Sequence, residues 1–282
     1  MPPPNESTEP VRPDQAAGPA GGRGRFRFDG KVALVTGGGG AIGSAVARAL
    51  GEHGADVAVL DFQEDAAEQV AEEIRRLGRQ ARAILCDVRN QEFVQQAVAQ
   101  VVDELGRLDV VVHTACYSGL RPLVEMTLAE FQENLHSCLT GAFIVSHAVG
   151  RVMIGQGRGG SLVHISSIAS ARALGRGTGA YAAAKAGLNA LVRELAVEWA
   201  PHGIRVNAVA PCQVRTPSLD RLLDSGLHGG REALTSRMLA AIPLGRLAEP
   251  EDMVGPCLFL ASGAASMVTG QILFADGGNT AQ

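Results

Sequence analysis

The stretch KVALVTGGGGAIG, residues 31–43, places a run of apolar and β-branched residues directly before a glycine-rich turn. Its first six residues predict a buried strand, and a helical pattern continues from the turn to about residue 53. Glycines between a strand and a helix let the backbone turn sharply and approach a pyrophosphate, whose charge is met by the helix N-terminus. The spacing Gly38-x-Gly40-x-x-Gly43 therefore indicates a loop that binds a dinucleotide, with an ordinary tight turn as the alternative.

Apolar strands alternate with longer helical patterns through the rest of the chain. Further strands are expected at 56–61, 81–87, 108–114, 159–167, 204–211 and 271–276, and helices at 65–77, 91–105, 128–154, 180–200 and near 250–262. Buried strands separated by helices favour a parallel sheet covered on both faces, and right-handed crossovers make that sheet doubly wound. We therefore predict an α/β fold, in which the segment 213–249 has mixed polarity and no assigned elements.

Composition excludes several classes of function. The chain has 282 residues, 46% hydrophobic and 19% charged, as expected of a globular protein. Residues 1–25 are rich in Pro, Gly, Glu and Arg, so we predict a disordered tail over 1–27 and one folded domain over 28–282. The net charge of −4 offers no strong basic field for nucleic acid or an anionic membrane, and no apolar run reaches the length of a membrane helix. Five cysteines without CxxC spacing favour neither a disulfide framework nor a zinc site, and no signal peptide is recognisable. We expect a reduced, cytoplasmic protein without a metal.

An acidic residue ends the second predicted strand. Asp61 lies 18 residues after Gly43, where a carboxylate can accept both hydroxyls of an adenosine ribose. The same charge would repel a 2′-phosphate, and neither Gly39 nor Gly40 offers a compensating positive charge. The pattern favours NAD over NADP, with a solvated carboxylate at a strand end as the alternative.

A tyrosine and a lysine share one face of a predicted helix. Tyr181 and Lys185 are four residues apart, in a chain with only two residues of each kind. A neighbouring ammonium favours the phenolate and should lower the pKa of Tyr181 from its usual value of about 10. Such a phenol can give and take a proton. Ser167 ends the preceding strand and could bind a substrate oxygen, or simply serve as a turn or capping serine.

Together these motifs resemble the short-chain dehydrogenase/reductase (SDR) family over about residues 28–282. The resemblance rests on FDGKVALVTG (28–37) with the glycine loop, CDV (86–88), ISS (165–167), YAAAKAG (181–187), IRVNAVAP (204–211), RTP (215–217), IPLGRLAEP (242–250) and GQILFADGG (270–278). It implies a Rossmann-type sheet of seven strands, hydride transfer between an alcohol and a ketone, and a tetramer or dimer.

The resemblance also assigns roles to residues. Tyr181 becomes the acid/base, Lys185 lowers its pKa and holds the nicotinamide ribose, and Ser167 orients the substrate oxygen. Asp87 and Val88 flank the adenine, and Thr216 contacts the carboxamide end. The full set implied for the cofactor is Gly37, Gly40, Ala41, Ile42, Gly43, Asp61, Asp87, Val88, Ala115, Tyr181, Lys185, Pro211, Val214 and Thr216.

The sequence departs from the family pattern in four places. Ala41 replaces the middle glycine of the loop, HTAC (113–116) replaces the family's NNAG after the fourth strand, and Cys212 replaces the glycine after the sixth strand. The most consequential is Cys138, at the position of an Asn in a proton relay, because a thiol forms poorer hydrogen bonds than an amide. The backbone carbonyl there is retained, and Asn134, one turn earlier, could partly compensate.

Two classes of function follow from these residues. The first is an NAD-dependent oxidoreductase that interconverts a secondary alcohol and a ketone by means of Ser167, Tyr181 and Lys185. The second is an NAD-binding relative with little or no catalysis and a sensor or partner role, which the change at Cys138 motivates. An acyl-carrier-protein ketoreductase using NADPH is disfavoured by Asp61. The substrate itself cannot be inferred from the expected pocket segments 117–123, 170–178 and 213–249, which contain Arg172, Leu174, Arg176 and Gln213 without a recognisable pattern.

The resemblance places three cysteines near the nicotinamide end of the cofactor: Cys116, Cys138 and Cys212. One interpretation is that these positions need small apolar residues. The other is that one thiol gains thiolate character and makes activity sensitive to oxidation. On the second interpretation we rank Cys138 first, because Lys185 would lower its pKa, then Cys116 and then Cys212.

Overall fold

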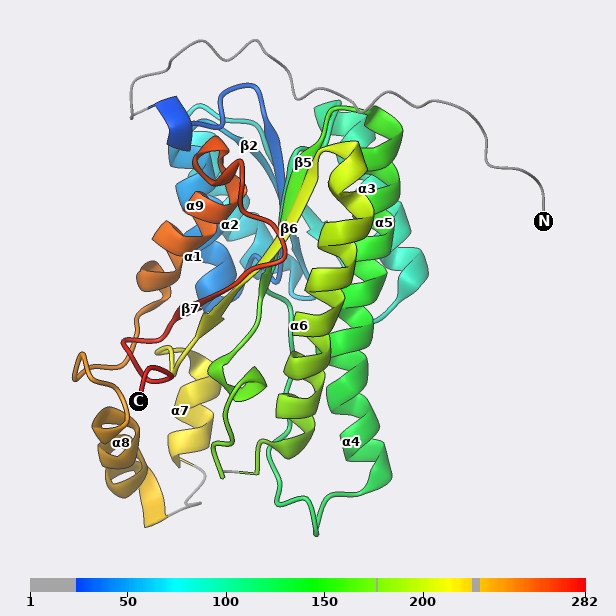
Figure 1. Cartoon of the computed structure of the whole chain (residues 1–282). Helices are drawn as coiled ribbons and strands as arrows, with labels where there is room; N and C mark the ends of the chain where they lie inside the picture. Colours follow the sequence, from blue (N-terminus) through cyan, green and yellow to red (C-terminus); the bar gives the residue numbers. More distant parts are fainter. Residues whose placement is uncertain (1–23, 176, 225–228) are drawn as a thin grey trace, which may run out of the picture.

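A seven-stranded parallel sheet forms the centre of the molecule (Figure 1). The structure is a computed structural model that describes residues 24–175, 177–224 and 229–282. The strands are β1 (Val32–Thr36), β2 (Asp56–Asp61), β3 (Ala81–Leu85), β4 (Val110–His113), β5 (Gly160–Ile165), β6 (Ile204–Pro211) and β7 (Ile272–Ala275). The α-helices are α1 (Ala41–Glu52), α2 (Glu64–Arg76), α3 (Gln91–Leu105), α4 (Leu128–Leu135), α5 (Gly141–Gln156), α6 (Gly179–Trp199), α7 (Pro217–Asp224), α8 (Gly230–Ala240) and α9 (Val254–Ala261). The predicted doubly wound α/β fold is confirmed.

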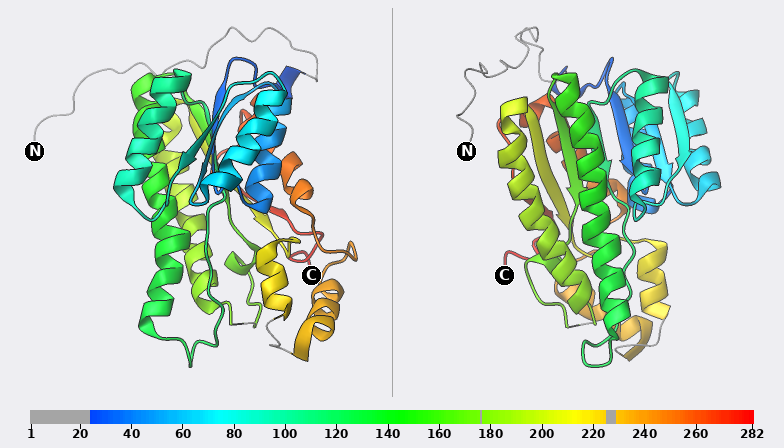
Figure 2. Two further views of the ribbon diagram at one scale, coloured as in Figure 1. Left: turned by 180° about the vertical axis from the view of Figure 1, so that it is seen from behind. Right: turned by 90° about the vertical axis from the view of Figure 1, so that its right-hand side faces the viewer.

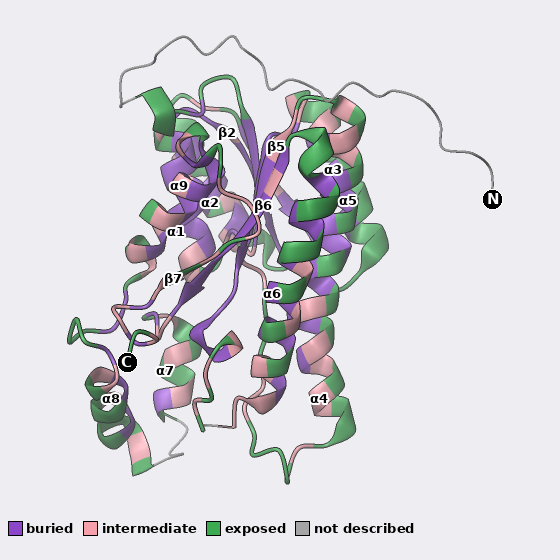
Figure 3. Cartoon of the chain, viewed as in Figure 1, coloured by how far each residue is buried: buried purple, intermediate pink, exposed green. Residues whose placement is uncertain are grey.

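Helices cover both faces of the sheet (Figure 2). Val32 and Leu34 of β1 pack into one apolar cluster with α3, α5 and α6, whereas Ala33 and Val35 pack into a second cluster with α1, α2 and α9. This alternation is the two-residue period of a strand, and burial on both sides explains why the strands are apolar throughout. In Figure 3 the inner strands are accordingly buried, the edge strand β7 is partly exposed, and the outer faces of the helices are exposed.

The order of the strands locates the site. The sheet runs β3-β2-β1-β4-β5-β6-β7, so the winding reverses between β1 and β4. Ligands of doubly wound sheets bind at the carboxyl ends of the strands beside such a reversal. The glycine loop after β1 and the segment after β4 both lie there.

The expected helix 128–154 is interrupted in a way that the sequence did not indicate. A five-residue π-helix, η2 (His136–Thr140), separates α4 from α5. Such widened turns occur often at functional sites, and this one contains Cys138. The continuous helical stretch Leu128–Gln156 is long and apolar enough to cross a membrane, contrary to our reading of the sequence. However, 56% of its most apolar window is buried inside the fold, as in the core helix of a globular protein.

The segment after β6 forms a small unit of its own. Its helices α7 and α8 share a third apolar cluster made of Leu223, Leu234, Met238, Ile242 and Leu247. In Figure 1 they lie at the lower end of the molecule, beyond β6 and β7. They therefore stand at the end of the sheet where the site is expected.

The predicted tail is described only from residue 24. Gly24–Phe26 form a short, exposed 3-10 turn, and residues 1–23 lie outside the described residues. Phe28, at the predicted start of the domain, is 3% exposed and packs into the second cluster.

Candidate active site

The glycine loop leaves an open helix N-terminus at the reversal point. Gly37 has a φ of +64°, which favours glycine, and a Cβ on Gly43 would lie 2.0 Å from the Gly37 oxygen and 2.8 Å from Thr114 Oγ1. Gly40 is the N-cap of α1 and offers no side-chain hydrogen bond to the first turn. The N–H groups of that turn therefore suit an anion such as a pyrophosphate. The methyl of Ala41, at the start of α1, and the side chain of Ile42 are only partly buried.

Asp61 is hydrogen-bonded to this loop. Its carboxylate accepts the Gly39 N–H at 2.9 Å and the Gln63 N–H at 3.0 Å, and the residue is 5% exposed. The alternative of a solvated carboxylate is therefore wrong. A fixed carboxylate beside a pyrophosphate loop is the arrangement that fits the ribose of an adenine dinucleotide.

The remaining residues implied for the cofactor lie along the same edge of the sheet. A Cβ on Gly37 would lie 2.8 Å from Ala115 N, so Ala115 adjoins the loop. Val88 is buried, whereas the Asp87 carboxylate binds Arg89 at 2.7 Å, which lowers the pKa of Asp87. Pro211 ends β6, Val214 is buried and bridges to Ala248, and Thr216 Oγ1 accepts the Leu219 N–H at 3.2 Å near the start of α7.

Ser167, Tyr181 and Lys185 meet as the resemblance implies. Ser167 follows β5, and its hydroxyl interacts with the Tyr181 phenol and lowers its pKa. Lys185 is 3% exposed, donates to the Ile165 carbonyl at 2.7 Å and lies 5.6 Å from the centre of the Tyr181 ring. Helix α6 presents the tyrosine and the lysine on one face, one turn apart.

The pKa of Tyr181 does not follow the prediction. Burial raises it to about 12, although the Lys185 ammonium and the Ser167 hydroxyl both lower it. The effect of Lys185 therefore has the predicted sign but is outweighed by desolvation, together with negative charge on Cys116. In this structure Tyr181 is a phenol at neutral pH.

The segment after β4 is hydrogen-bonded to the π-helix beside two cysteines. The Tyr117 N–H donates to Ser137 Oγ at 2.7 Å, and the Cys138 thiol lies 3.1 Å from the Tyr117 carbonyl oxygen, to which it donates. Cys138 and Lys185 both interact with the Cys116 sulfur. Cys138 is 1% exposed, whereas Cys116 is exposed.

Our ranking of the thiols is wrong. The interaction with Cys138, together with Lys185, lowers the pKa of Cys116 to about 6 against the cost of desolvation. The interaction with Cys116 and burial raise the pKa of Cys138, and burial raises that of Cys212. Burial lowers the pKa of Lys185, but its neighbours Cys116 and Tyr181 raise it above the ordinary value. Cys116 is thus the thiolate, and Cys138 keeps its proton.

Asn134 does not replace the missing amide at position 138. Its Nδ2 donates to the Glu130 carbonyl at 2.8 Å, within its own helix. Its Oδ1 is buried and has no hydrogen-bond partner within the described residues. Compensation by Asn134 therefore finds no support in its hydrogen bonds.

Two buried histidines beside the site were missed by sequence reasoning. His113 and His164 are direct neighbours across β4 and β5, with ring centroids 5.3 Å apart. His113 Nδ1 lies 2.7 Å from Thr36 Oγ1, and His164 Nε2 lies 3.2 Å from Ser146 Oγ. Burial lowers the pKa of both rings, that of His164 to about 3, so both are neutral. Their buried positions in consecutive apolar strands were the only available signal.

Two of the expected pocket walls lie together. The Arg121 N–H donates to the Gly177 carbonyl at 3.0 Å, which joins segment 117–123 to segment 170–178. Arg172 donates to the Asn279 Oδ1 at 2.9 Å and so ties the second wall to the chain end, whereas Arg176 lies outside the described residues.

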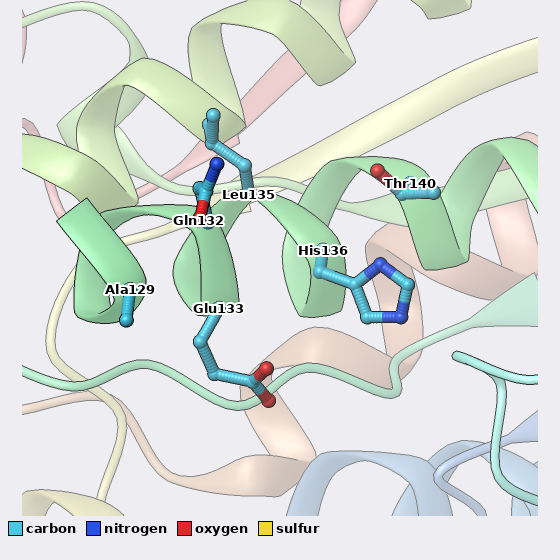
Figure 4. Close-up of a pocket in the computed structure, with 6 residues that line it drawn as sticks. All are labelled: Ala129, Gln132, Glu133, Leu135, His136 and Thr140. Carbon is cyan, nitrogen blue, oxygen red and sulfur yellow. The ribbon is translucent and has the colours of Figure 1, made fainter.

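Separate shallow hollows lie over the outer side of α4 and the π-helix. One, of about 490 Å³, is lined by Ala129, Gln132, Glu133, Leu135, His136 and Thr140 (Figure 4), and its neighbour, of about 500 Å³, reaches Asp87 and Arg89. Neither is lined by Ser167, Tyr181 or Lys185. Across residues 24–175, 177–224 and 229–282 there is no group of three or more His, Cys, Asp or Glu side chains that could hold a metal.

Comparison with known proteins agrees with this architecture. A family model described as enoyl-(acyl carrier protein) reductase matches residues 39–280. D-threitol dehydrogenase of Mycolicibacterium smegmatis is 37% identical over 90% of this chain and 95% of its own length. L-rhamnose 1-dehydrogenase (NAD(P)(+)) of a Sphingomonas species is 38% identical over 89% and 96%. A 7α-hydroxysteroid dehydrogenase complexed with NADH and 7-oxo glycochenodeoxycholic acid superposes with a TM-score of 0.85 at 34% identity, covering 92% of this chain and 98% of that one.

The chain therefore belongs to the short-chain dehydrogenase/reductase family. It is an oxidoreductase of that family, and its glycine loop and the carboxyl edge of its sheet are where a nicotinamide cofactor binds.

Proposed function

We propose that this protein is an NAD-dependent oxidoreductase that interconverts a secondary alcohol and a ketone. The observation that carries the proposal is the cluster of Ser167, Tyr181 and Lys185, in which the hydroxyl of Ser167 and the ammonium of Lys185 both interact with the Tyr181 phenol. A bound nicotinamide would supply or accept the hydride.

The chain's own residues supply binding and proton transfer. The substrate oxygen would sit between the hydroxyls of Ser167 and Tyr181, which interact with each other. Tyr181, as a phenol, would donate its proton to a ketone during reduction and recover one from an alcohol during oxidation. Lys185 favours the phenolate that forms after donation, because its ammonium lies against the ring.

The choice of NAD rests on Asp61. Its buried carboxylate touches the loop that would hold the pyrophosphate, where a 2′-phosphate would bring a second negative charge. The negative charge of Asp61 also disfavours the alternative of an acyl-carrier-protein ketoreductase, because that enzyme would use NADPH. A weakly catalytic relative is the remaining alternative, because Cys138 replaces an amide.

The test is NADH formation with a panel of secondary alcohols that includes four- to six-carbon polyols and aldoses, since relatives are named for threitol and rhamnose. Turnover by the unmodified protein, lost in Tyr181→Phe, is the expected result. NAD binding without turnover of any panel member would favour the weakly catalytic alternative.

We also propose a cytoplasmic homo-oligomer, a tetramer or dimer. Exposed apolar side chains on α5 and α6 support this, with Phe143 52% and Val197 76% exposed. Light scattering coupled to gel filtration would measure the mass, and a monomer at micromolar concentration would contradict the proposal.

A further inference from the structure

Two thiols of different character meet at the nicotinamide end of the site. Cys116, in the segment after β4, is exposed and interacts with Lys185 and Cys138, and the N–H of the next residue, Tyr117, donates to Ser137 Oγ at 2.7 Å. Cys138, in the π-helix, is 1% exposed and lies 3.1 Å from the carbonyl oxygen of Tyr117, the neighbour of Cys116. We call Cys116 and Cys138 the cysteine pair.

We propose that the cysteine pair is a peroxide-reactive modification site, in which Cys116 attacks a hydroperoxide and Cys138 resolves the product to an intramolecular disulfide. The ligand class is a hydroperoxide, and hydrogen peroxide is the simplest member. The site is separate from the oxidoreductase reaction, which needs neither sulfur as a nucleophile.

The chemistry balances with hydrogen peroxide as the oxidant. The Cys116 thiolate attacks one peroxide oxygen, the O–O bond breaks, and the departing hydroxide takes up a proton as water. The Cys138 sulfur then attacks the Cys116 sulfenic acid. An S–S bond forms, the S–O bond breaks, and the sulfenic acid OH leaves with the Cys138 proton as a second water. The pair loses two electrons and the peroxide gains two.

Position and charge assign the two roles. The attacking sulfur must be accessible and anionic, and Cys116 is exposed, with the Lys185 ammonium as its cationic partner. The other titratable groups that interact with it are Cys138 and Tyr181. The resolving sulfur need only reach Cys116, and the buried Cys138 thiol lies 3.1 Å from the carbonyl oxygen of the adjoining Tyr117 and interacts with the Cys116 sulfur. Cys86 and Cys257 are buried, and burial raises the pKa of both, so they are unsuited to attack.

The first experiment counts thiols and needs no substrate. The whole chain is treated with one equivalent of hydrogen peroxide, and free thiols, intact mass and peptides from a glutamate-specific protease are measured. Cleavage after Glu125, Glu130 or Glu133 separates the two cysteines, so a disulfide-linked peptide identifies the bond directly. We expect the loss of two of the five thiols and two hydrogens of mass, reversed by dithiothreitol. A disulfide that involves Cys212, or no loss of thiols, overturns the proposal.

Two variants separate the roles, and Cys212→Ser is the matched control. Cys138→Ser should stop at a Cys116 sulfenic acid, trapped as a dimedone adduct, whereas Cys116→Ser should lose no thiol. Cys212→Ser should still form the disulfide. Formation of a dimedone adduct at Cys138 in Cys116→Ser would reverse the assignment and overturn the proposal.

Alkylation by iodoacetamide tests the charge of Cys116 independently. Its modification, read from peptide masses across pH 5–9, should have a midpoint near pH 6, since the pKa of Cys116 is about 6. Lys185→Met should raise that midpoint by about one pH unit or more, and Cys138→Ala provides the same test if the lysine variant fails to fold. A midpoint near the ordinary thiol value of about 8.5 overturns the proposal.

Discussion

Removing the charge of Asp61 should change which cofactor the protein prefers. Asp61→Asn keeps the shape of the side chain but replaces a carboxylate that is 5% exposed and held by the N–H groups of Gly39 and Gln63. Two unit charges about 5 Å apart repel by about 3 kcal/mol at an effective dielectric constant of about 20. Because the carboxylate is buried, solvent screens little of this. The ratio of NADP to NAD affinity should therefore rise about hundredfold in Asp61→Asn.

Calorimetric titration with NAD and with NADP measures both affinities without a known substrate. Asp56→Asn is the matched control, because Asp56 begins the same strand and its carboxylate accepts Arg79 Nη2 at 2.8 Å and the Gln80 N–H at 2.9 Å. The control should keep the NAD preference of the unmodified protein. Equal affinity of the unmodified protein for the two cofactors, or an unchanged ratio in Asp61→Asn, would refute the electrostatic reasoning.

Four further outcomes follow from the site, the core and the N-terminal segment. Tyr181→Phe should lose turnover by a factor of about 10² or more while NAD titration is unchanged, and a rate within a few-fold of the parent would identify another acid/base. Because the pKa of Tyr181 is raised to about 12, the rate of alcohol oxidation should increase with pH through the alkaline range. In Lys185→Met, a pH–rate profile should show this increase at a still higher pH. Burial lowers the pKa of His164 to about 3, below the unfolded value of about 6.5, so its contribution to stability is full above pH 6.5 and is lost as pH falls towards 3, at up to about 1.4 kcal/mol per pH unit. Urea unfolding measured at pH 7 and at pH 5 should show that the free energy of unfolding falls less in His164→Gln than in the parent. Deleting residues 1–23, which offer little to bury, should shift Tm by less than about 2 °C because the buried Phe28 is kept; a larger fall would show that the segment packs on the domain.

Local sequence predicts the elements of this fold well because the five inner strands, β1, β2, β4, β5 and β6, are buried on both faces. The helix expected at 91–105 occurs with those bounds, and the strand expected at 56–61 does too. The strand expected at 81–87 ends at Leu85, and β3 is an edge strand that pairs only with β2. Its outer side lacks a partner that would extend the ladder. In 213–249 the apolar residues serve the small cluster of α7 and α8, which gives no period that matches the main core.

The candidate site is predicted less completely because its energetics depend on burial and on contacts between distant segments. Spacing places Tyr181 and Lys185 together, but the sign of the pKa shift depends on desolvation and on sulfur atoms from two other segments. The contact between Cys116 and Cys138 requires the π-helix, for which the sequence gives no signal. The neighbouring rings of His113 and His164 likewise depend on the register of β4 with β5.

The exchange of an amide for a thiol at position 138 changes what Lys185 is paired with. Cys138 and the Lys185 ammonium stabilise negative charge on Cys116, and that charge raises the pKa of Lys185 in turn. Burial and negative charge on Cys116 raise the pKa of Tyr181, whereas Lys185 lowers it. Thiolate and phenolate therefore compete for one cation. An uncharged disulfide at the same position would leave Lys185 to the phenolate, which is the form that alcohol oxidation requires, and so should lower the pKa of Tyr181.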